Sequence, residues 1–432
     1  MTRWWILALL SLVIAGNYYA YDSIAPVADL LRTARGFTQQ QIGLLNAVFS
    51  LPNIALALVG GILIDRFGPA RVSLWTAALC CVGTVLTAIG MPFGLMVLGR
   101  LLFGVGEETL LIALLAGLAQ WFSAGGTAVA MALFFSLARV GSYAADISPR
   151  WAHALYRHGA EPPLWLAAGI TGASLAAAIV YAVVDRKVRP SSSGGHRERA
   201  NAAAAGAARR PDGVSWSDIK RFDRSYWYIL ALNVLFASVF FPFRSTFAIE
   251  YFQDAKGLSL EAAGLVNSWV FFAAIFATPV FGFIADELGH RALLMAVGTF
   301  MMPLTFLTLG ATNWSLWIST ALMGISFSVV PAVIWPSTAM LVEPARLGTA
   351  YGLVNVLQNV GLAVCNLAAG WLNDENRAGP AHPSGFDAML WFFGILSFVA
   401  FVFIALLWLR ESGPNGHGLE TLSGSSRGHQ RM

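Results

Sequence analysis

Long apolar stretches, separated by shorter polar segments, recur along the whole chain. A helix needs about 20 mostly apolar residues to cross the ~30 Å apolar core of a bilayer. Twelve stretches of the sequence meet this requirement, and they are residues 4–24, 42–64, 72–91, 94–122, 127–149, 163–184, 226–250, 260–285, 291–311, 314–341, 348–372 and 388–410. The pattern therefore predicts an all-α polytopic membrane protein with twelve transmembrane helices.

The basic residues between these stretches predict the direction in which the helices run. If the N-terminus is cytoplasmic, the cytoplasmic segments contain 18 Lys and Arg residues and the outer segments contain six. Cytoplasmic loops of membrane proteins carry the excess of positive charge. We therefore expect both termini on the cytoplasmic side of the membrane.

The longest polar segment divides the predicted helices six and six. The expected parts are an N-terminal six-helix bundle in residues 1–184, a cytoplasmic linker in 185–225, a C-terminal six-helix bundle in 226–410 and a disordered cytoplasmic tail in 411–432. Near the end of the linker, Trp216, Ile219 and Phe222 recur every three residues among charged side chains. This spacing favours a short helix at the membrane interface, with a solvated loop as the alternative.

The composition excludes several classes of protein. Hydrophobic residues make up 57% of the chain and charged residues 12%, about half the charged share of a soluble domain. These values exclude an ordinary cytosolic enzyme, a nucleic-acid binder and a disordered chain. The three cysteines lie in apolar runs that lack the spacing of a metal site, and no phosphate-binding loop of the G-x-x-x-x-G-K type occurs. We therefore expect no enzymatic activity, no cofactor, no metal and no nucleic-acid partner.

A motif that contains glycine and aspartate occurs twice at corresponding positions. Residues 61–68 read Gly-Ile-Leu-Ile-Asp-Arg-Phe-Gly, and residues 282–289 read Gly-Phe-Ile-Ala-Asp-Glu-Leu-Gly at an offset of 221. Six predicted helices separate the copies, which indicates two parallel repeats related by an axis along the membrane normal. A gating role is favoured, with a merely solvated turn as the alternative. The residues expected to act in gating are Gly61, Asp65, Arg66, Gly68, Arg71, Asp286 and Gly289.

The repeat and five further segments resemble the major facilitator superfamily over all twelve predicted helices. The five segments are Gly-Arg-Leu-Leu-Phe-Gly-Val-Gly-Glu-Glu (99–108), Phe-Ser-Leu-Ala-Arg-Val-Gly-Ser (135–142), Val-Phe-Phe-Pro-Phe (239–243), Ile-Trp-Pro-Ser (334–337) and Leu-Gly-Thr-Ala-Tyr-Gly-Leu (347–353). Within the superfamily the chain looks most like the lysosomal dipeptide transporter branch and its bacterial relatives. The resemblance implies two pseudo-symmetric six-helix bundles and uniport of dipeptides, preferably cationic ones. It also implies that an acid binds the peptide amine and an arginine binds its carboxylate, roles that fall on Glu108 and Arg139, with Trp335 as an aromatic wall.

Two of these residues are also expected near the middle of the membrane on grounds of depth alone. Glu108 lies about 14 residues, or ~21 Å, into the fourth predicted helix, and Arg139 about 12 residues, or ~18 Å, into the fifth. A charge at that depth usually faces a cavity or a partner. A guanidinium binds a carboxylate bidentately and a carboxylate accepts an ammonium, so the pair can bind a zwitterion. The alternative is a structural salt bridge that only joins the two helices.

Other residues within the predicted helices are secondary candidates. Those that could couple transport to a second ion are Glu107, Arg100 and Asp22. Further residues that could contact the substrate are Tyr19 and Asn359, with packing and helix–helix hydrogen bonding as alternatives. Arg244 lies near the outer end of the seventh predicted helix, so its side chain is expected to reach the membrane interface.

The sequence favours a secondary transporter that moves a small-molecule substrate by alternating access. Proton-coupled peptide symport and export of a drug or metabolite are alternatives within transport, and a membrane receptor or scaffold is the alternative outside it. The chain is expected to contact the lipid bilayer as a monomer, and nothing in it indicates an accessory subunit. A bacterial-type inner membrane is favoured over a lysosomal membrane, because the tails carry no obvious lysosomal sorting motif and the outer loops are short.

Overall fold

The computed structural model describes residues 2–89, 92–122, 126–188, 221–343, 346–414 and 416–421. Within these ranges the protein is helical and contains no β-strand. The helices of the first part of the chain are α1 (Thr2–Asp22), η1 (Ala25–Val27), α2 (Ala28–Arg35), α3 (Gln39–Phe67), α4 (Pro69–Ile89), α5 (Phe93–Trp121), α6 (Thr127–Asp146), α7 (Ser148–Trp151), α8 (His153–Tyr156) and α9 (Glu161–Val188). Those of the second part are α12 (Arg224–Pro242), η2 (Phe243–Phe247), α13 (Ala248–Asp254), α14 (Leu260–Leu288), α15 (Arg291–Ala311), α16 (Leu316–Leu341), α17 (Leu347–Glu375), η4 (Pro383–Phe386) and α18 (Asp387–Glu411).

Each of the twelve predicted transmembrane stretches overlaps one long helix, the seventh being the continuous stretch α12–η2–α13. Among the described residues, ten helical stretches are long and apolar enough to cross a membrane, and an eleventh is added if the bent helix α3 counts as one span. Helix α6, which carries Arg139, is not among them. The prediction of an all-α polytopic membrane protein is confirmed.

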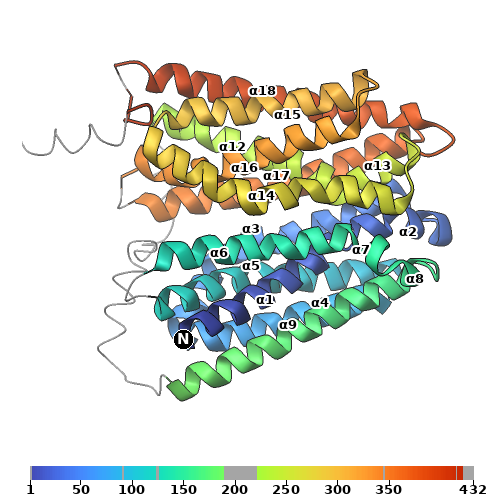
Figure 1. The fold of residues 1–432 in the computed structure, drawn as a ribbon, viewed down its shortest axis with the longest axis horizontal. Helices are drawn as coiled ribbons and strands as arrows, with labels where there is room; N and C mark the ends of the chain where they lie inside the picture. The colour runs from blue at the N-terminus through green and yellow to red at the C-terminus, as the bar shows by residue number, and fades with distance from the viewer. Residues whose placement is uncertain are drawn as a thin grey trace, which may run out of the picture.

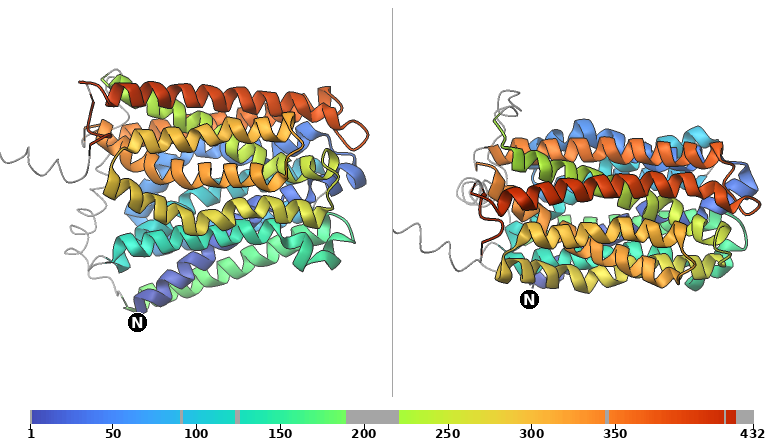
Figure 2. Two further views of the ribbon diagram at one scale, coloured as in Figure 1. Left: turned by 45° about the horizontal axis from the view of Figure 1, so that its top comes forward. Right: turned by 90° about the horizontal axis from the view of Figure 1, so that it is seen from above.

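The long helices run side by side and form two groups (Figure 1). Helices α1 to α9 make up one group and helices α12 to α18 the other, and the further views in Figure 2 show the same arrangement. The N-terminus, the end of α9 and the start of α12 lie at one end of the molecule, which we call the linker side. The short helices α2, α7, α8 and η4 lie at the opposite end, which we call the loop side.

Each group has its own apolar core. In the second group the core is rich in phenylalanine, including Phe240, Phe243 and Phe327, and in the first group it includes Phe103 and Phe134. The two groups meet mainly where α3 packs on α17 and where α6 packs on α14. These two helix pairs therefore frame the interface in which a site shared by both groups must lie.

Local sequence determines where several of these helices begin and end. Thr38 begins α3 with a capping box, in which its side chain accepts a hydrogen bond from the Gln41 N–H. Helix α3 ends at Gly68 and α14 ends at Gly289, and both glycines have positive φ angles, 83° and 67°, which glycine adopts without strain. The two copies of the predicted motif therefore end two corresponding helices.

The seventh span contains a break that the sequence pattern did not predict. Pro242 is followed by a π-helical turn, η2, before α13 continues the span. The turn carries Arg244, Ser245 and Thr246, all of which are buried. A π-helical turn holds an extra residue, and such turns occur frequently at functional sites.

The C-terminal segment differs from the disordered tail predicted for 411–432 over its described part. Glu420 accepts hydrogen bonds from the backbone N–H groups of Ala292 and Leu293 at 2.9 and 3.1 Å, which caps the start of α15. Leu419 is fully buried in the core of the second group. The tail therefore folds back onto the linker side as far as residue 421. The predicted interfacial helix around Trp216 and Ile219 lies outside the described residues.

Candidate functional site

The guanidinium of Arg139 lies among three aromatic rings in the interface between the two helix groups. Its central carbon is 5.1 Å from the centre of the Tyr18 ring, and 5.0 Å from the centres of both the Phe271 and Phe327 rings. Tyr18 belongs to α1 of the first group, whereas Phe271 and Phe327 belong to α14 and α16 of the second. Each such cation–π contact contributes about 0.5–2 kcal/mol. Rings from both groups therefore hold one cation in place.

Two carboxylates lie near this cation. Glu107 and Glu108 are adjacent on α5, where Glu107 is 5% exposed and Glu108 is half-buried. The Tyr18 hydroxyl interacts electrostatically with Arg139 and with both carboxylates. The structure thus gathers the predicted acid and the predicted arginine around one tyrosine.

None of these three charged side chains has a hydrogen-bond or ion-pair partner within the described part of the chain. Neither Arg139, Glu107 nor Glu108 makes a hydrogen bond, or an ion pair within 4.0 Å, with another described residue. The alternative in which Glu108 and Arg139 form a structural salt bridge therefore does not describe this structure. Charges in the membrane interior that lack a protein partner usually face a water-filled cavity or a ligand.

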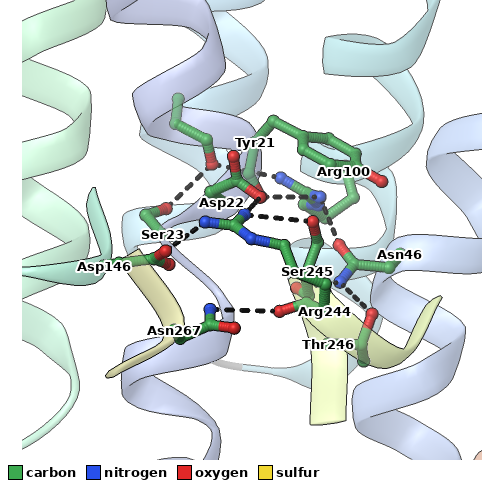
Figure 3. Close-up of polar contacts among 11 residues, drawn as sticks. Tyr21, Asp22, Ser23, Asn46, Arg100, Asp146, Arg244, Ser245, Thr246 and Asn267 are labelled. Atoms are coloured by element: carbon green, nitrogen blue, oxygen red, sulfur yellow. Dashed lines mark hydrogen bonds and ion pairs between the residues drawn. The ribbon is translucent and has the colours of Figure 1, made fainter. Parts of the chain in front are cut away.

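The remaining charges of the spans are paired. Arg244 of η2 is fully buried and donates to Asp22 of α1 at 2.8 Å and to Asp146 of α6 (Figure 3). Its guanidinium also lies 3.8 Å from the centre of the Phe271 ring, the same ring that contacts Arg139. The expectation that Arg244 reaches the membrane interface is wrong, because two carboxylates from the other helix group bind it inside the protein.

Arg100 also has a full set of acceptors. It donates to the carbonyl oxygen of Leu45 at 3.2 Å. It also donates to the Asn46 side-chain oxygen at 2.5 Å (Figure 3). The Asn46 amide in turn donates to the Thr246 hydroxyl at 2.8 Å, and that hydroxyl donates to Asn366 at 2.7 Å. A chain of hydrogen bonds therefore runs from α5 through α3 and η2 to α17. In this structure Arg100 and Asp22, two of the predicted coupling residues, hold helices together.

The predicted aromatic contact lies one residue away from its expected position. Tyr19 is 3% exposed and packs with Ala145 and Ala167 inside the first group, away from Arg139. Tyr18 contacts Arg139 instead. Adjacent residues on a helix point about 100° apart, and α1 is apolar on most of its surface, so the sequence did not distinguish the two tyrosines.

The structure does not bring Trp335 or Asn359 into contact with Arg139. Trp335 is 39% exposed and pairs with Tyr351, whose hydroxyl donates to the Trp335 carbonyl oxygen at 3.0 Å. Asn359 is buried between α17 and α3, where it accepts a hydrogen bond from Asn53 at 3.5 Å. Helix–helix hydrogen bonding, the alternative considered for Asn359, describes its position.

The first copy of the gating motif is exposed on the linker side. The side chains of Asp65, Arg66 and Arg71 are exposed and make no hydrogen bond or ion pair with any described residue. Atoms placed as a side chain on Gly61 or Gly68 would have no neighbour within 4 Å. In the second copy, Asp286 forms a 2.7 Å ion pair with Arg291 of α15, which lies in the same helix group, and Gly289 ends α14.

No sequence signal identifies Phe271 and Phe327, because they are two of 29 phenylalanines in a largely apolar chain. Asp146 could be recognised as a charge within a span, but its partner Arg244 is distant in the sequence. Among the described residues, no three His, Cys, Asp or Glu side chains gather in the way that a metal site requires.

Comparison with known proteins agrees with this architecture. The chain matches the sequence profile of the Major Facilitator Superfamily over residues 10–252 and again over residues 231–426. The lysosomal dipeptide transporter MFSD1 of Homo sapiens is 28% identical over 382 residues, which cover 86% of this chain and 80% of that protein. A probable sulfoacetate transporter of Cupriavidus necator is 24% identical over 396 residues, which cover 86% of this chain and 87% of that protein.

Solved structures show the same fold at lower sequence identity. A crystal structure of the nucleoside transporter NupG superposes with a TM-score of 0.73 at 11% identity, covering 93% of this chain and 99% of that one. A bacterial homologue of the human lysosomal transporter Spinster, in an inward-facing and unoccupied conformation, superposes with a TM-score of 0.69 at 16% identity. That match covers 94% of this chain and 97% of the homologue.

Proposed function

The chain belongs to the major facilitator superfamily of membrane transporters, and on this premise we propose that it carries dipeptides across a membrane by alternating access. The observation that supports the proposal is the division of the charges within its spans. Arg100, Arg244, Asp22 and Asp146 make hydrogen bonds or ion pairs with other residues, whereas the side chains of Glu107, Glu108 and Arg139 make none with the described residues. All three interact electrostatically with Tyr18, and Arg139 lies in the interface between the two helix groups, so a substrate can supply their ion-pair partners.

A dipeptide has the charges that this set of side chains would bind. The planar guanidinium of Arg139 offers paired donors to a carboxylate, and Glu108 accepts the hydrogen bonds of an ammonium. The amine and the carboxylate of an extended dipeptide are ~6–7 Å apart, further than in a single amino acid. The names of the relatives in several vertebrates, lysosomal dipeptide transporters, support this substrate class.

The count of charges also favours a cationic dipeptide. The site offers two carboxylates and one guanidinium, so a zwitterion that binds Arg139 and Glu108 leaves Glu107 without an ion-pair partner among the described residues. A buried carboxylate without a partner is costly. A Lys, Arg or His side chain on the dipeptide would balance Glu107, and uniport follows if the substrate brings all the positive charge. A proton on Glu107 would serve equally, and that is the basis of the second candidate function, proton-coupled symport.

The arrangement of the two groups supports an inward-facing conformation. If the termini are cytoplasmic, as the basic residues suggest, the linker side faces the cytoplasm. The ion pairs of Arg244 join the two groups toward the loop side. The gating motif on the linker side is exposed. The closed side would then be the outer or luminal one, and the site near Arg139 would be reached from the cytoplasm.

Transport into liposomes by the purified protein tests the proposal. Lys-, Arg- or His-containing dipeptides should enter down their gradient without an imposed proton gradient. The Arg139→Lys and Glu108→Gln variants should raise the apparent KM at least about tenfold, because a hydrogen-bonded charge contributes about 1.5–3 kcal/mol. Arg157→Lys and Glu261→Gln, which change exposed residues outside the site in the same way, should transport like the wild type.

Each other outcome has a defined meaning. Uptake that requires an imposed proton gradient would replace uniport with symport. Unchanged dipeptide uptake by both site variants would contradict the assignment of the site. If no dipeptide is taken up while a drug or another metabolite is, the substrate class is wrong and the transport function stands.

A further inference from the structure

Helices α3 and α17 pack against each other in the interface and run in opposite directions. On the loop side, the end of α17 caps the start of α3. The carboxylate of Asp374, at the end of α17, accepts hydrogen bonds from the backbone N–H groups of Gln39 and Gln40, both at 2.8 Å. These are the first two residues of α3, whose N–H groups have no partner inside their own helix. A carboxylate is favoured at this position by the helix dipole. The second helix group thus supplies the N-terminal cap of a helix in the first.

The backbones of the two helices touch at this end. A β-carbon added to Gly370 would lie 2.6 Å from the carbonyl oxygen of Gln39, and one added to Gly43 would lie 2.3 Å from that of Asn366. Atoms cannot approach so closely, so only glycine fits at either position while the loop side is closed. The contact between α3 and α17 depends on Gly370 as well as on Asp374.

The same spacing of glycine and aspartate occurs at the opposite end of the pair. Residues 370–374 read Gly-Trp-Leu-Asn-Asp at the end of α17, and residues 61–65 read Gly-Ile-Leu-Ile-Asp at the end of α3. On the linker side, however, this second arrangement is not engaged. Side-chain atoms placed on Gly61 or on Gly348, at the start of α17, would meet nothing within 4 Å, and α17 begins without a side-chain cap.

We propose that Asp374 is a gating residue of the transport cycle: with Gly370 it closes the loop side by capping α3, and it must release α3 when that side opens. The inference rests on the alternating access proposed above, but not on the identity of the substrate. The end of α17 is thereby a loop-side counterpart of the motif at the end of α3. Each helix of the pair would carry an acid that caps the other, and only one cap would be formed at a time.

Asp374 does not act alone on the loop side. Arg32 of α2 donates to Glu250 and Asp254 of α13, and the Gln39 side chain donates to Glu250 at 2.7 Å. These contacts also join the two helix groups. Loss of the Asp374 cap should therefore shift the conformational equilibrium without abolishing the closed state.

The test measures distances between spin labels on the two groups by pulsed electron paramagnetic resonance, in the full chain without substrate. Cysteines replace the exposed Ala34 and Ala381 on the loop side, in a background in which Cys80, Cys81 and Cys365 are changed to alanine. Asp374→Ala should raise the ratio of loop-side-open to loop-side-closed molecules about fivefold, the usual scale for loss of one helix cap. Asp65→Ala should lower that ratio, because it weakens the opposite conformation.

Matched variants distinguish a gating role from general destabilisation. Glu375→Gln removes the neighbouring exposed carboxylate and should leave the distances unchanged. Gly370→Ala should open the loop side, whereas Gly61→Ala, which meets no atoms in this conformation, should not. The inference is overturned if Asp374→Ala and Gly370→Ala give the distance distribution of Glu375→Gln while an open population exists. If no variant shows an open population at all, alternating access itself is contradicted.

Discussion

The buried ion pairs of Arg244 allow a quantitative prediction about the stability of the closed loop side. Arg244 joins η2 to Asp22 and Asp146, and all three side chains are at most 2% exposed. The change Arg244→Met removes the cation and leaves two carboxylates buried together. Removing one partner of a buried ion pair costs about 3–5 kcal/mol. These contacts join the two helix groups, so the cost falls on the closed conformation.

This penalty converts to a change in how often the loop side opens. A cost of 3–5 kcal/mol corresponds to roughly two to three and a half orders of magnitude in the equilibrium constant. Relaxation of the protein and entry of water reduce the penalty, so we expect about a 100-fold increase in opening. Asp146→Asn should have a smaller effect, because Arg244 and Asp22 then remain as a one-to-one pair.

The rate at which a buried cysteine is labelled measures this opening. Ala25 on the loop side is 1% exposed and packs against the core of the second group, so Ala25→Cys reports exposure of the interface. In detergent, and with the native cysteines replaced by alanine, Arg244→Met should raise the labelling rate about 100-fold. The triple change Arg244→Met, Asp22→Asn and Asp146→Asn buries no charge and should label more slowly than Arg244→Met alone. The reasoning would be refuted if the Arg244→Met variant labelled at the wild-type rate. It would also be refuted if the triple variant labelled faster than Arg244→Met.

Three further predictions concern thermal unfolding of the purified protein in detergent. Gly141→Ala should lower the melting temperature, because its β-carbon would lie 1.8 Å from the carbonyl oxygen of Ala15. Gly169→Ala should not lower it, because its β-carbon would have no neighbour within 4 Å. Equal melting temperatures of the two variants would contradict the close packing of α6 on α1. Arg100→Leu should destabilise by about 1.5–3 kcal/mol through loss of hydrogen bonds to a buried charge, and an unchanged melting temperature would count against its structural role. Glu420→Ala should lower the free energy of unfolding by about 1 kcal/mol, because α15 loses its cap. An unchanged free energy of unfolding would contradict the docking of the tail on α15.

The sequence predicted the helices and the charged centre because both depend on local or compositional properties. Apolar stretches of sufficient length identify spanning helices whatever they pack against. Depth along a helix likewise follows from counting residues, so the sequence predicts Glu108 and Arg139 near the middle of the membrane. Their lack of a protein partner could not be predicted, because it depends on the arrangement of five helices.

The sequence does not show in the same way which face of each helix points into the protein. In a membrane both the lipid-facing and the buried surfaces are apolar, so periodicity does not show which side chains point inward. For this reason the sequence predicts a substrate contact at Tyr19, whereas Tyr18 is the tyrosine that contacts Arg139. The ion pair of Arg244 with Asp22 joins residues 222 positions apart, and no local pattern connects them.

The π-helical turn Phe243–Phe247 also bears on how this protein tolerates insertions and deletions. The turn holds one residue more than an α-helical turn, so α12 and α13 keep different registers within one span. Deleting one of its five residues would restore a continuous α-helix and, because the turn absorbs one extra residue, would leave α13 in nearly its present orientation. Glu250 would then still face Arg32. In a library of variants, single-residue deletions in this turn that spare Arg244 should therefore be lost less often than single-residue deletions within α12 or α13, which rotate the rest of the span by about 100°, and alignments that treat the span as a regular helix will misplace one half of it.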